Sequence, residues 1–351
     1  MYLQSKLEDY SQEINIAIVG CGKFITMFLA QYYKLKKINI RTIVDINIQG
    51  AKDNCKKAGL DKNTISKISF FSTIDPLLED NNIDIVIEAT GSAIAGIKNA
   101  KNIIESFKNL IMVNVEADAV AGKYLSDLAL KHNIIYSMAY GDQPSLIIEQ
   151  IEWGLSSGFE VIAAGKGTKF HPSFRLSTPD TVWHNYGITN ENAEKAGMNP
   201  KMFNSFITGD KSSIEMVAVV NGSHLEYPKE GLNYPAIDIK DIAKTIIPKS
   251  KGGILQNSNQ VEVISSININ KENIKEDLRW GVFIVFEGKN EYVKDCFKQY
   301  GIITDGSGTY SALWRPYHYI GLELAQSIYS ISLLKQSTGK TKYFKADVAC
   351  I

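Results

Sequence analysis

Short apolar runs alternate with longer amphipathic segments along the first 150 residues. Each apolar run is long enough for a buried strand and too short for a helix. The segments between the runs place apolar residues three or four positions apart, which predicts helices that cover the strands. Strands that alternate with helices are typical of a parallel, doubly wound sheet, so an α/β fold is expected. The expected strands are Ile14–Val19, Ile40–Val44, Ile68–Phe71, Ile83–Ile87, Leu110–Val113 and Ile134–Met138.

The first expected strand runs directly into Gly20-Cys21-Gly22, and a helical pattern follows. Gly20 permits a sharp turn, Gly22 lets the backbone approach a phosphate, and the helix N-terminus supplies N–H groups and a positive dipole. This order of elements predicts the pyrophosphate site of a dinucleotide-binding unit. The third position of the G-x-G-x-x-G pattern is Ile25, which predicts a slightly more open first helix. The alternative is a buried strand that simply ends in a glycine turn.

Further strand ends carry residues that suit a dinucleotide. Asp45 follows the second strand, where a carboxylate can bind ribose hydroxyls and repel a 2′-phosphate, which favours NAD over NADP. Alternatively, Asp45 caps the next helix. Asp142 is expected to cap the helix that leads into the second half, with Pro144 in its first turn. The candidate cofactor-binding residues are Gly20, Cys21, Gly22, Lys23, Phe24, Asp45, Thr90, Gly91, Asn114, Glu116, Gly141, Asp142 and Gln143.

The alternation of strands and helices stops at Phe159. A strand at Val161–Ala164 is expected to lead into a glycine loop over residues 165–169 that carries Lys166 and Lys169. Lysines in such a loop would line an anion or carbonyl site or, alternatively, a solvated surface. The segment 171–187 is too polar and irregular for a core element and too long for a simple connection, which indicates a functional loop.

Later segments predict an open, mostly antiparallel sheet. Lys211 and Glu215 are four positions apart, which is typical of a surface salt bridge on a helix, although Lys211 is also a candidate for proton transfer. Arg315 and His318 are expected at the N-terminus of a long helix to Leu334, where an anion is favoured. Strands are expected at Gln260–Ile267, Leu278–Phe286 and Ala346–Cys350, and Tyr310–Leu313 leads into the segment that begins with Arg315.

Composition and charge narrow the function classes. The 351 residues include 38 Lys and Arg and 38 Asp and Glu, so no net field attracts nucleic acid or a membrane surface. No apolar run is long enough for a membrane span, and the start lacks the apolar region of a signal peptide. Four cysteines without a C-x-x-C pair predict reduced thiols, a cytoplasmic location and no cysteine zinc site.

Eight segments in order carry a resemblance that is more specific than the glycine turn. They are VNVEADAVAG, YSMAYGDQPSLI, AAGKGTKF, STPDTVW, MNPKMFNSF, GDKSSIEM, DLRWGVFIVFE and RPYHYIGLEL. Over residues 14–335 the chain resembles the homoserine-dehydrogenase-like oxidoreductases that include the type II 1-deoxy-D-xylulose 5-phosphate reductoisomerase. The resemblance implies a Rossmann domain at 1–145, an α+β catalytic and oligomerisation domain with a mixed sheet at 146–315, a helix at 316–335 that returns to the first domain, and a tail at 336–351.

Many relatives continue into a SAF-type domain where this tail lies, so the chain is expected to be a short member or a truncated form. The resemblance implies an NAD(P)H-dependent oxidoreductase of a small, anionic, sugar-derived substrate, phosphorylated or carboxylated. Its sharpest form is reductoisomerase chemistry in isoprenoid precursor synthesis, in which a rearrangement gives an aldehyde that receives hydride. The alternatives are a simple NAD-dependent dehydrogenase of a polyol, sugar acid or homoserine-like substrate, and a non-catalytic dinucleotide sensor.

Two departures from the family pattern matter for these alternatives. Homoserine dehydrogenases carry a lysine shortly after the asparagine that corresponds to Asn114, whereas Val115 and Glu116 follow here, which argues against homoserine oxidation. The resemblance to the reductoisomerase implies NADPH as the cofactor, whereas Asp45 favours NAD.

The catalytic candidates are residues that can polarise a carbonyl, hold a phosphate, move a proton or tune such a group. They are Lys166, Lys169, Lys211, Glu116 and Glu215. The substrate-binding candidates, chosen as polar or anion-holding groups, are Arg175, Ser177, Asp180, Arg315 and His318. A divalent metal on Asp180 or Glu116 could hold a ketol oxygen pair, although no ligand spacing demands one. The mixed sheet further predicts a homodimer or homotetramer.

Overall fold

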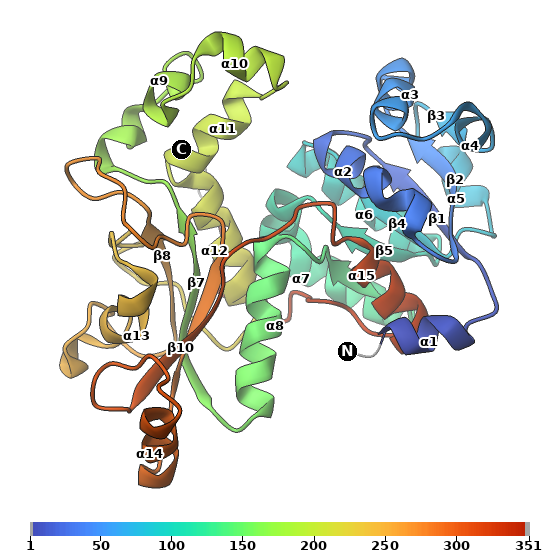
Figure 1. Ribbon diagram of the computed structural model, residues 1–351. Coiled ribbons are helices and arrows are strands. Elements are labelled where there is room, and N and C mark those ends of the chain that lie inside the picture. The colour runs from blue at the N-terminus through green and yellow to red at the C-terminus, as the bar shows by residue number, and fades with distance from the viewer. Residues whose placement is uncertain (1–2, 348–351) are drawn as a thin grey trace. The chain divides into compact units, whose positions relative to one another are not determined.

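The computed structural model describes residues 3–347, which divide into two units (Figure 1). The first unit comprises the described residues up to Leu146 together with Tyr319–Phe344. The second comprises Ile147–His318 and the described residues from Lys345 onwards. Within the described part of the chain, no helix combines the length and apolar character that crossing a membrane requires.

A six-stranded sheet forms the centre of the first unit, in the order β3-β2-β1-β4-β5-β6. All neighbouring strands pair in parallel, which confirms the doubly wound α/β fold. The strand order reverses between β1 and β4, and ligands bind at the carboxyl ends of strands at such a switch point. The strands are β1 (Ile14–Val19), β2 (Ile38–Val44), β3 (Ser69–Phe71), β4 (Ile85–Glu88), β5 (Asn109–Met112) and β6 (Tyr136–Met138).

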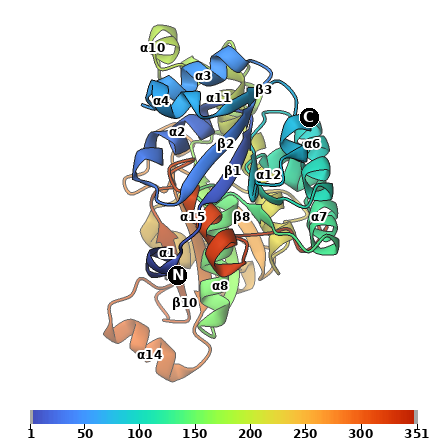
Figure 2. The same cartoon turned by 90° about the vertical axis from the view of Figure 1, so that its right-hand side faces the viewer.

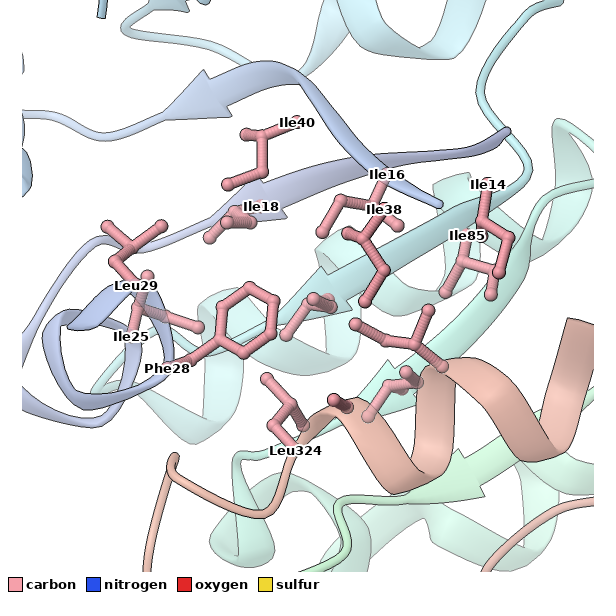
Figure 3. Packing of buried hydrophobic residues seen from close by; sticks show 14 of the residues in the cluster. Ile14, Ile16, Ile18, Ile25, Phe28, Leu29, Ile38, Ile40, Ile85 and Leu324 are labelled. Carbon is pink, nitrogen blue, oxygen red and sulfur yellow. The ribbon is translucent and has the colours of Figure 1, made fainter. Parts of the chain in front are cut away.

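Helices cover both faces of this sheet, and each face has its own apolar cluster. Figure 2 shows α2 and α3 on one side and α6 and α7 on the other. On the first side, Ile16, Ile18 and Phe28 are buried together with Leu324 from near the C-terminal end (Figure 3). The helices are α1 (Leu3–Asp9), α2 (Lys23–Gln31), α3 (Ile48–Lys57), α4 (Lys62–Ser66), α5 (Asp75–Glu79), α6 (Ala93–Glu105), α7 (Val115–Lys131) and α15 (Ala325–Tyr329), with a 3-10 turn η1 (Tyr32–Lys34).

The long helix expected after His318 is wrong. Gly321 has a φ of +72°, and a Cβ there would lie 2.2 Å from the carbonyl oxygen of Phe24, so the backbone turns where a helix was expected. Regular helix begins only at α15 and continues as a π-helical turn, η5 (Ser330–Leu334). Arg315 therefore ends strand β10 and His318 lies in the coil after it, so neither residue lies at a helix N-terminus.

The segment after η5 adds to the edge of the first sheet. The hydroxyl of Thr338 donates to the carbonyl oxygen of Met138 in β6 at 2.9 Å. The hydroxyl of Thr341 donates to the buried carboxylate of Asp118 at 2.9 Å. These contacts fix the segment onto the first unit. The strand expected at Ala346–Cys350 extends past the described residues, and Ala346 lies in no regular element.

A four-stranded sheet in the order β10-β9-β7-β8 forms the centre of the second unit. The β7·β9 and β9·β10 pairs are antiparallel and the β7·β8 pair is parallel, which confirms an open mixed sheet. The strands are β7 (Glu160–Thr168), β8 (Gln260–Ser265), β9 (Val282–Glu287) and β10 (Tyr310–Arg315). The helices are α8 (Gln143–Ser156), which begins in the first unit, α9 (Val182–Tyr186), α10 (Asn190–Lys195), α11 (Pro200–Ile207), α12 (Asp210–Gly222), α13 (Ile242–Thr245) and α14 (Glu291–Gln299), with 3-10 turns η2 (Pro172–Leu176), η3 (Ile239–Asp241) and η4 (Lys249–Lys251).

The polar segment 171–187 contains core residues, contrary to expectation. Phe174, Val182 and Trp183 are buried in an apolar cluster that also includes Ile207 of α11. The sequence pattern failed here because η2 and α9 are each a single short turn, over which hydrophobic periodicity cannot be detected.

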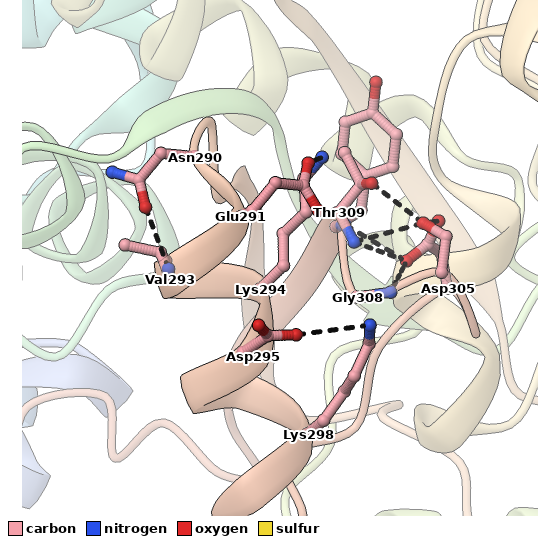
Figure 4. Close-up of polar contacts among 11 residues, drawn as sticks. Asn290, Glu291, Val293, Lys294, Asp295, Lys298, Asp305, Gly308 and Thr309 are labelled. Atoms are coloured by element: carbon pink, nitrogen blue, oxygen red, sulfur yellow. Dashed lines mark hydrogen bonds and ion pairs between the residues drawn. The ribbon is translucent and has the colours of Figure 1, made fainter.

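Helix α14 and the loop before β10 were not expected from the sequence (Figure 4). Asn290 caps the helix by accepting the N–H of Val293 at 2.9 Å. The carboxylate of Asp305 accepts the N–H groups of Gly308 and Thr309 at 3.1 Å each, which closes the loop. Local side-chain caps therefore order a polar region that has no long apolar run.

Candidate functional site

The glycine turn has the geometry expected of a phosphate cradle. Gly20 has a φ of +87°, and a Cβ there would lie 2.8 Å from the carbonyl oxygen of Ala89, so the position requires glycine. Gly22 is exposed at the N-cap of α2, and no protein atom lies within 4 Å of a Cβ built there. Ile25, the departure from the motif, is fully buried and packs into the core. Open space and unpaired N–H groups at a helix N-terminus fit a pyrophosphate.

Asp45 braces this turn from the end of β2. One oxygen of its carboxylate accepts the N–H of Cys21 at 2.8 Å, and the other accepts the N–H of Asn47 at 2.8 Å. The alternative that Asp45 caps α3 is wrong, because Asn47 is the N-cap and accepts the N–H of Gly50 at 2.9 Å. The sequence analysis missed Ile46, whose side chain is 95% exposed and offers an apolar surface beside the carboxylate.

A buried carboxyl group organises the carboxyl ends of β4 and β5. The hydroxyl of Thr90 donates to Glu88 at 2.5 Å, and the amide of Asn114 donates to the carbonyl oxygens of Thr90 and Ser92 at 2.9 Å each. Glu88 is 0% exposed, and its Oε2 has no hydrogen-bond partner among the described residues. Burial raises the pKa of Glu88 to about 7. Glu88 therefore holds the loop that carries the cofactor candidates Thr90 and Gly91, and Asn114 ties the loop after β5 to it.

Replacing Glu88 with glutamine is expected to change the pH dependence of stability. The pKa of Glu88 rises from 4.5 to about 7 on folding, so its stabilising contribution is complete below pH 4.5 and is lost as the pH rises through 7. Because glutamine does not titrate, Glu88→Gln should gain about 2–3 kcal/mol relative to the wild type between pH 5 and pH 8. Urea unfolding of both proteins at the two pH values measures this gain, and an unchanged difference would contradict the raised pKa.

The remaining cofactor candidates lie on α7 and at the start of α8. Glu116 is half-buried in the first turn of α7. Gly141 has a φ of +91°, and a Cβ there would meet Glu323 at 2.8 Å. Asp142 directly precedes α8 and accepts the N–H of Gln143 at 2.9 Å, which agrees with the expected helix start.

Lys166 lies inside strand β7 and not in the expected glycine loop. A Cβ on Gly165 would lie 1.7 Å from the carbonyl oxygen of Glu262, and one on Gly167 would lie 1.9 Å from that of Leu278. The two glycines therefore allow neighbouring backbone to approach closely, and they do not form a turn. Between them, the Lys166 side chain is held on a rigid strand.

Lys166 and Glu215 form a buried ion pair between β7 and α12. Their side chains are only 8% and 5% exposed. The expectation that Glu215 belongs to a surface pair with Lys211 is therefore wrong, because a spacing of four cannot show that this face of α12 is covered. Within residues 3–347, Glu215 is the one hydrogen-bond acceptor of the Lys166 ammonium. An ammonium has three N–H donors, so two remain for a bound oxygen.

Lys169 has a structural role in this arrangement. Its ammonium donates to the carbonyl oxygens of Asn185 and Tyr186 at 3.2 and 2.9 Å, and it lies over the Tyr186 ring. Burial and nearby Arg279 lower the pKa of Lys169. Arg279 lies in the DLRWG segment and forms a two-pronged ion pair with Asp277 at 2.9 Å per contact, but the sequence analysis gave it no role. Its position within a family motif was the signal that could have marked Arg279 as a candidate.

The substrate-binding candidates do not converge on one site in the structure, and each contacts different partners. Arg175 lies over the ring of Phe170 at 5.3 Å. Ser177 accepts the side-chain N–H of Asn185 at 3.0 Å, and Asp180 is exposed. The candidate His318 lies elsewhere, with its Nδ1 2.6 Å from the carbonyl oxygen of Trp280.

A divalent metal site is not defined by the residues that the structure describes. No group of three or more His, Cys, Asp or Glu side chains among them could hold a metal ion, and this includes the candidates Asp180 and Glu116.

Comparisons with solved structures give only distant similarities. S. aureus homoserine dehydrogenase is 15% identical, with 93% of this chain and 78% of that chain covered and a TM-score of 0.49. Myo-inositol dehydrogenase from Corynebacterium glutamicum is 10% identical, with 48% of each chain covered and a TM-score of 0.36. No curated protein sequence matches the chain significantly.

Two family profiles match the chain and together span most of it. Residues 14–114 match the oxidoreductase family with an NAD-binding Rossmann fold, which covers the glycine turn and Asp45. Residues 141–324 match the catalytic domain of oxidoreductase DRL, which covers Lys166 and Glu215. This second match spans more than half of the chain. The chain therefore belongs to the DRL oxidoreductase family and is an enzyme that uses a nicotinamide dinucleotide.

Proposed function

We propose that this enzyme reduces a small, anionic, sugar-derived carbonyl compound with NADH or NADPH. Its sharpest form is the isomerisation and reduction of 1-deoxy-D-xylulose 5-phosphate, a step of isoprenoid precursor synthesis. The observation that carries the proposal is the buried ion pair between Lys166 and Glu215. The family match over residues 141–324 supports it, because it includes both residues.

Lys166 supplies the positive group that carbonyl reduction requires. Hydride addition turns a carbonyl oxygen into an alkoxide, and a fixed ammonium stabilises that negative charge as it develops. The water-excluded surroundings of Lys166 strengthen the interaction. Lys166 then donates a proton to the oxygen, and Glu215 holds the lysine in position until that point.

The same pair suits the rearrangement that precedes reduction. A ketol rearrangement needs a hydroxyl proton removed while the neighbouring carbonyl is polarised. Glu215 is the carboxylate beside Lys166 and can accept such a proton through it. One buried acid–base pair would thus serve both steps.

The first unit supplies the dinucleotide site. A bound nicotinamide cofactor provides the hydride. The N–H groups at the start of α2 bind the pyrophosphate, and Gly22 keeps the approach to them open. Asp45 accepts hydrogen bonds from the adenosine ribose in addition to the two backbone N–H groups that it already holds.

Asp45 also favours a second candidate function, a simple NAD-dependent dehydrogenase of a polyol or sugar acid. Its carboxylate, at the end of β2, would repel the 2′-phosphate of NADPH. This candidate needs the same Lys166–Glu215 pair but no rearrangement.

Replacing Asp45 with asparagine is expected to shift cofactor preference towards NADPH. The amide oxygen can still accept one N–H, while the repulsion of a 2′-phosphate is lost. The ratio of kcat/KM for NADPH to that for NADH should rise by roughly tenfold, since about 1.4 kcal/mol of repulsion corresponds to that factor. Initial rates with both cofactors measure the ratio. An unchanged ratio would show that Asp45 does not face the ribose.

The proposed function is tested by following NADH and NADPH absorbance with 1-deoxy-D-xylulose 5-phosphate in buffer that contains Mg²⁺ or Mn²⁺. Oxidation of one cofactor equivalent per substrate, with a branched polyol phosphate as product, would support reductoisomerase chemistry. Reduction of NAD by polyols or sugar acids, without any reaction of the keto sugar phosphate, would instead establish the simple dehydrogenase.

A further inference from the structure

Two cysteines meet beneath the glycine turn. Cys21 is the middle residue of the turn, and Cys55 lies on α3. Both side chains are buried in the same apolar cluster, and the buried residues of α3 are Ala51 and Cys55. The Cys21 Sγ also lies 3.8 Å from the carbonyl oxygen of Ala51, one helical turn before Cys55. Both cysteines are free thiols in this structure.

The backbone of Cys21 is tied to the same helix. The side-chain amide of Asn54 donates to the carbonyl oxygen of Cys21 at 2.7 Å. On the other side, the N–H of Cys21 donates to Asp45 at 2.8 Å. A change at the Cys21 side chain is therefore transmitted to backbone that is fixed on both sides and that continues directly into Gly22.

We propose that Cys21 and Cys55 form a reversible disulfide that closes the dinucleotide site. A disulfide holds its two sulfurs about 2 Å apart, closer than two unbonded thiols can lie, so it draws Cys21 towards α3. The N–H groups of Gly22 and the following residues, which would bind the pyrophosphate, move with it. The oxidised form should therefore bind the cofactor more weakly.

A peroxide oxidises the pair in two balanced steps. The Cys55 thiolate attacks the O–O bond of hydrogen peroxide, which gives a sulfenic acid and, after protonation, water. The Cys21 sulfur then attacks the sulfenic sulfur, the S–S bond forms, and a second water leaves. Cys55 is the attacking thiol because the hydrogen bond from Cys21 lowers the pKa of Cys55. Thiol reductants reverse the reaction.

Linkage makes the effect reciprocal. If the disulfide weakens NADH binding by a given factor, bound NADH must disfavour disulfide formation by the same factor. A cofactor-loaded enzyme is therefore protected, and an empty one is exposed to oxidation. This inference rests on the proposed dinucleotide site at the glycine turn, but the disulfide itself can be detected independently.

The experiment treats the full-length protein with hydrogen peroxide, with and without saturating NADH. Peptide mass spectrometry detects the crosslink, and NADH fluorescence gives the dissociation constant before and after oxidation. We expect a Cys21–Cys55 peptide, at least a tenfold weaker affinity for NADH, recovery with dithiothreitol and slower crosslinking when NADH is bound.

Cys55→Ser and Cys55→Ala should keep the NADH affinity of the reduced wild type and lose its response to peroxide. Cys296→Ser, at a cysteine outside the pair, should respond as the wild type does. The absence of the crosslinked peptide, or a crosslinked protein that binds NADH as tightly as the reduced one, would overturn the inference. Failure of the reduced protein to bind NADH or NADPH would instead contradict the dinucleotide site itself.

Discussion

Replacing Lys166 with methionine is expected to lower kcat by roughly 10²–10⁴-fold, the range that a positioned acid–base group contributes. Methionine fills similar space but can neither donate a hydrogen bond nor carry charge. NADH binding should not change, because the dinucleotide site is built from residues of the first unit. Steady-state rates and NADH titrations of the purified variant measure the two effects separately.

The stability of this variant must be separated from its activity. Lys166→Met leaves the Glu215 carboxylate buried and unpaired, which costs about 3–5 kcal/mol. The double variant Lys166→Met/Glu215→Leu removes both charges and should recover most of that stability while remaining inactive. Lys195→Met removes a lysine from an exposed pair with Glu191 and should change neither quantity. Full activity in the double variant would exclude the ion pair from the chemistry.

Gly20→Ala is expected to lose stability, whereas Gly22→Ala is expected to lose affinity for NADH. Gly20→Ala places a side chain at a φ of +87° and 2.8 Å from the backbone of Ala89, so it should lower the free energy of unfolding by at least about 2 kcal/mol. Gly22→Ala meets no protein atom within 4 Å and has an ordinary negative φ, so the fold should keep its stability. Its methyl group would instead occupy the space of the pyrophosphate, and NADH should bind at least tenfold more weakly.

This pair of variants distinguishes a structural glycine from a ligand-binding one. Urea unfolding gives the stability of each, and NADH fluorescence gives the affinity. If Gly22→Ala binds NADH as the wild type does, the pyrophosphate lies elsewhere. If Gly20→Ala is as stable as the wild type, the left-handed backbone at this turn is not required.

The first sheet could be predicted because its strands are continuous apolar runs. Parallel strands that are buried on both faces, such as Ile85–Glu88, leave a signal that does not depend on distant residues. The roles of Gly165 and Gly167, in contrast, could not be predicted from the sequence. A glycine in a turn and a glycine that lets a neighbouring strand approach look the same in a sequence. Only the structure distinguishes them, because a Cβ built on Gly165 would lie 1.7 Å from the carbonyl oxygen of Glu262.

The functional pair was predictable as residues but not as a contact. Lys166 and Glu215 were both catalytic candidates, yet their pairing depends on how α12 packs over β7. The helix that was expected after His318 failed for a similar reason, since Gly321 turns where the backbone of Phe24 leaves no room. Glu88 was missed because an acidic residue at the end of a strand is usually solvated, whereas here Gly96 and Asn99 of α6 lie beside its buried carboxyl group.

The most direct test of the account is a single-turnover reaction with NADH or NADPH that carries deuterium at the transferable C4 position. With 1-deoxy-D-xylulose 5-phosphate as substrate, the account predicts a product that contains one deuterium, formed by the wild type and not by Lys166→Met. Deuterium that stays in the nucleotide, or equal transfer by Lys166→Met, would contradict it.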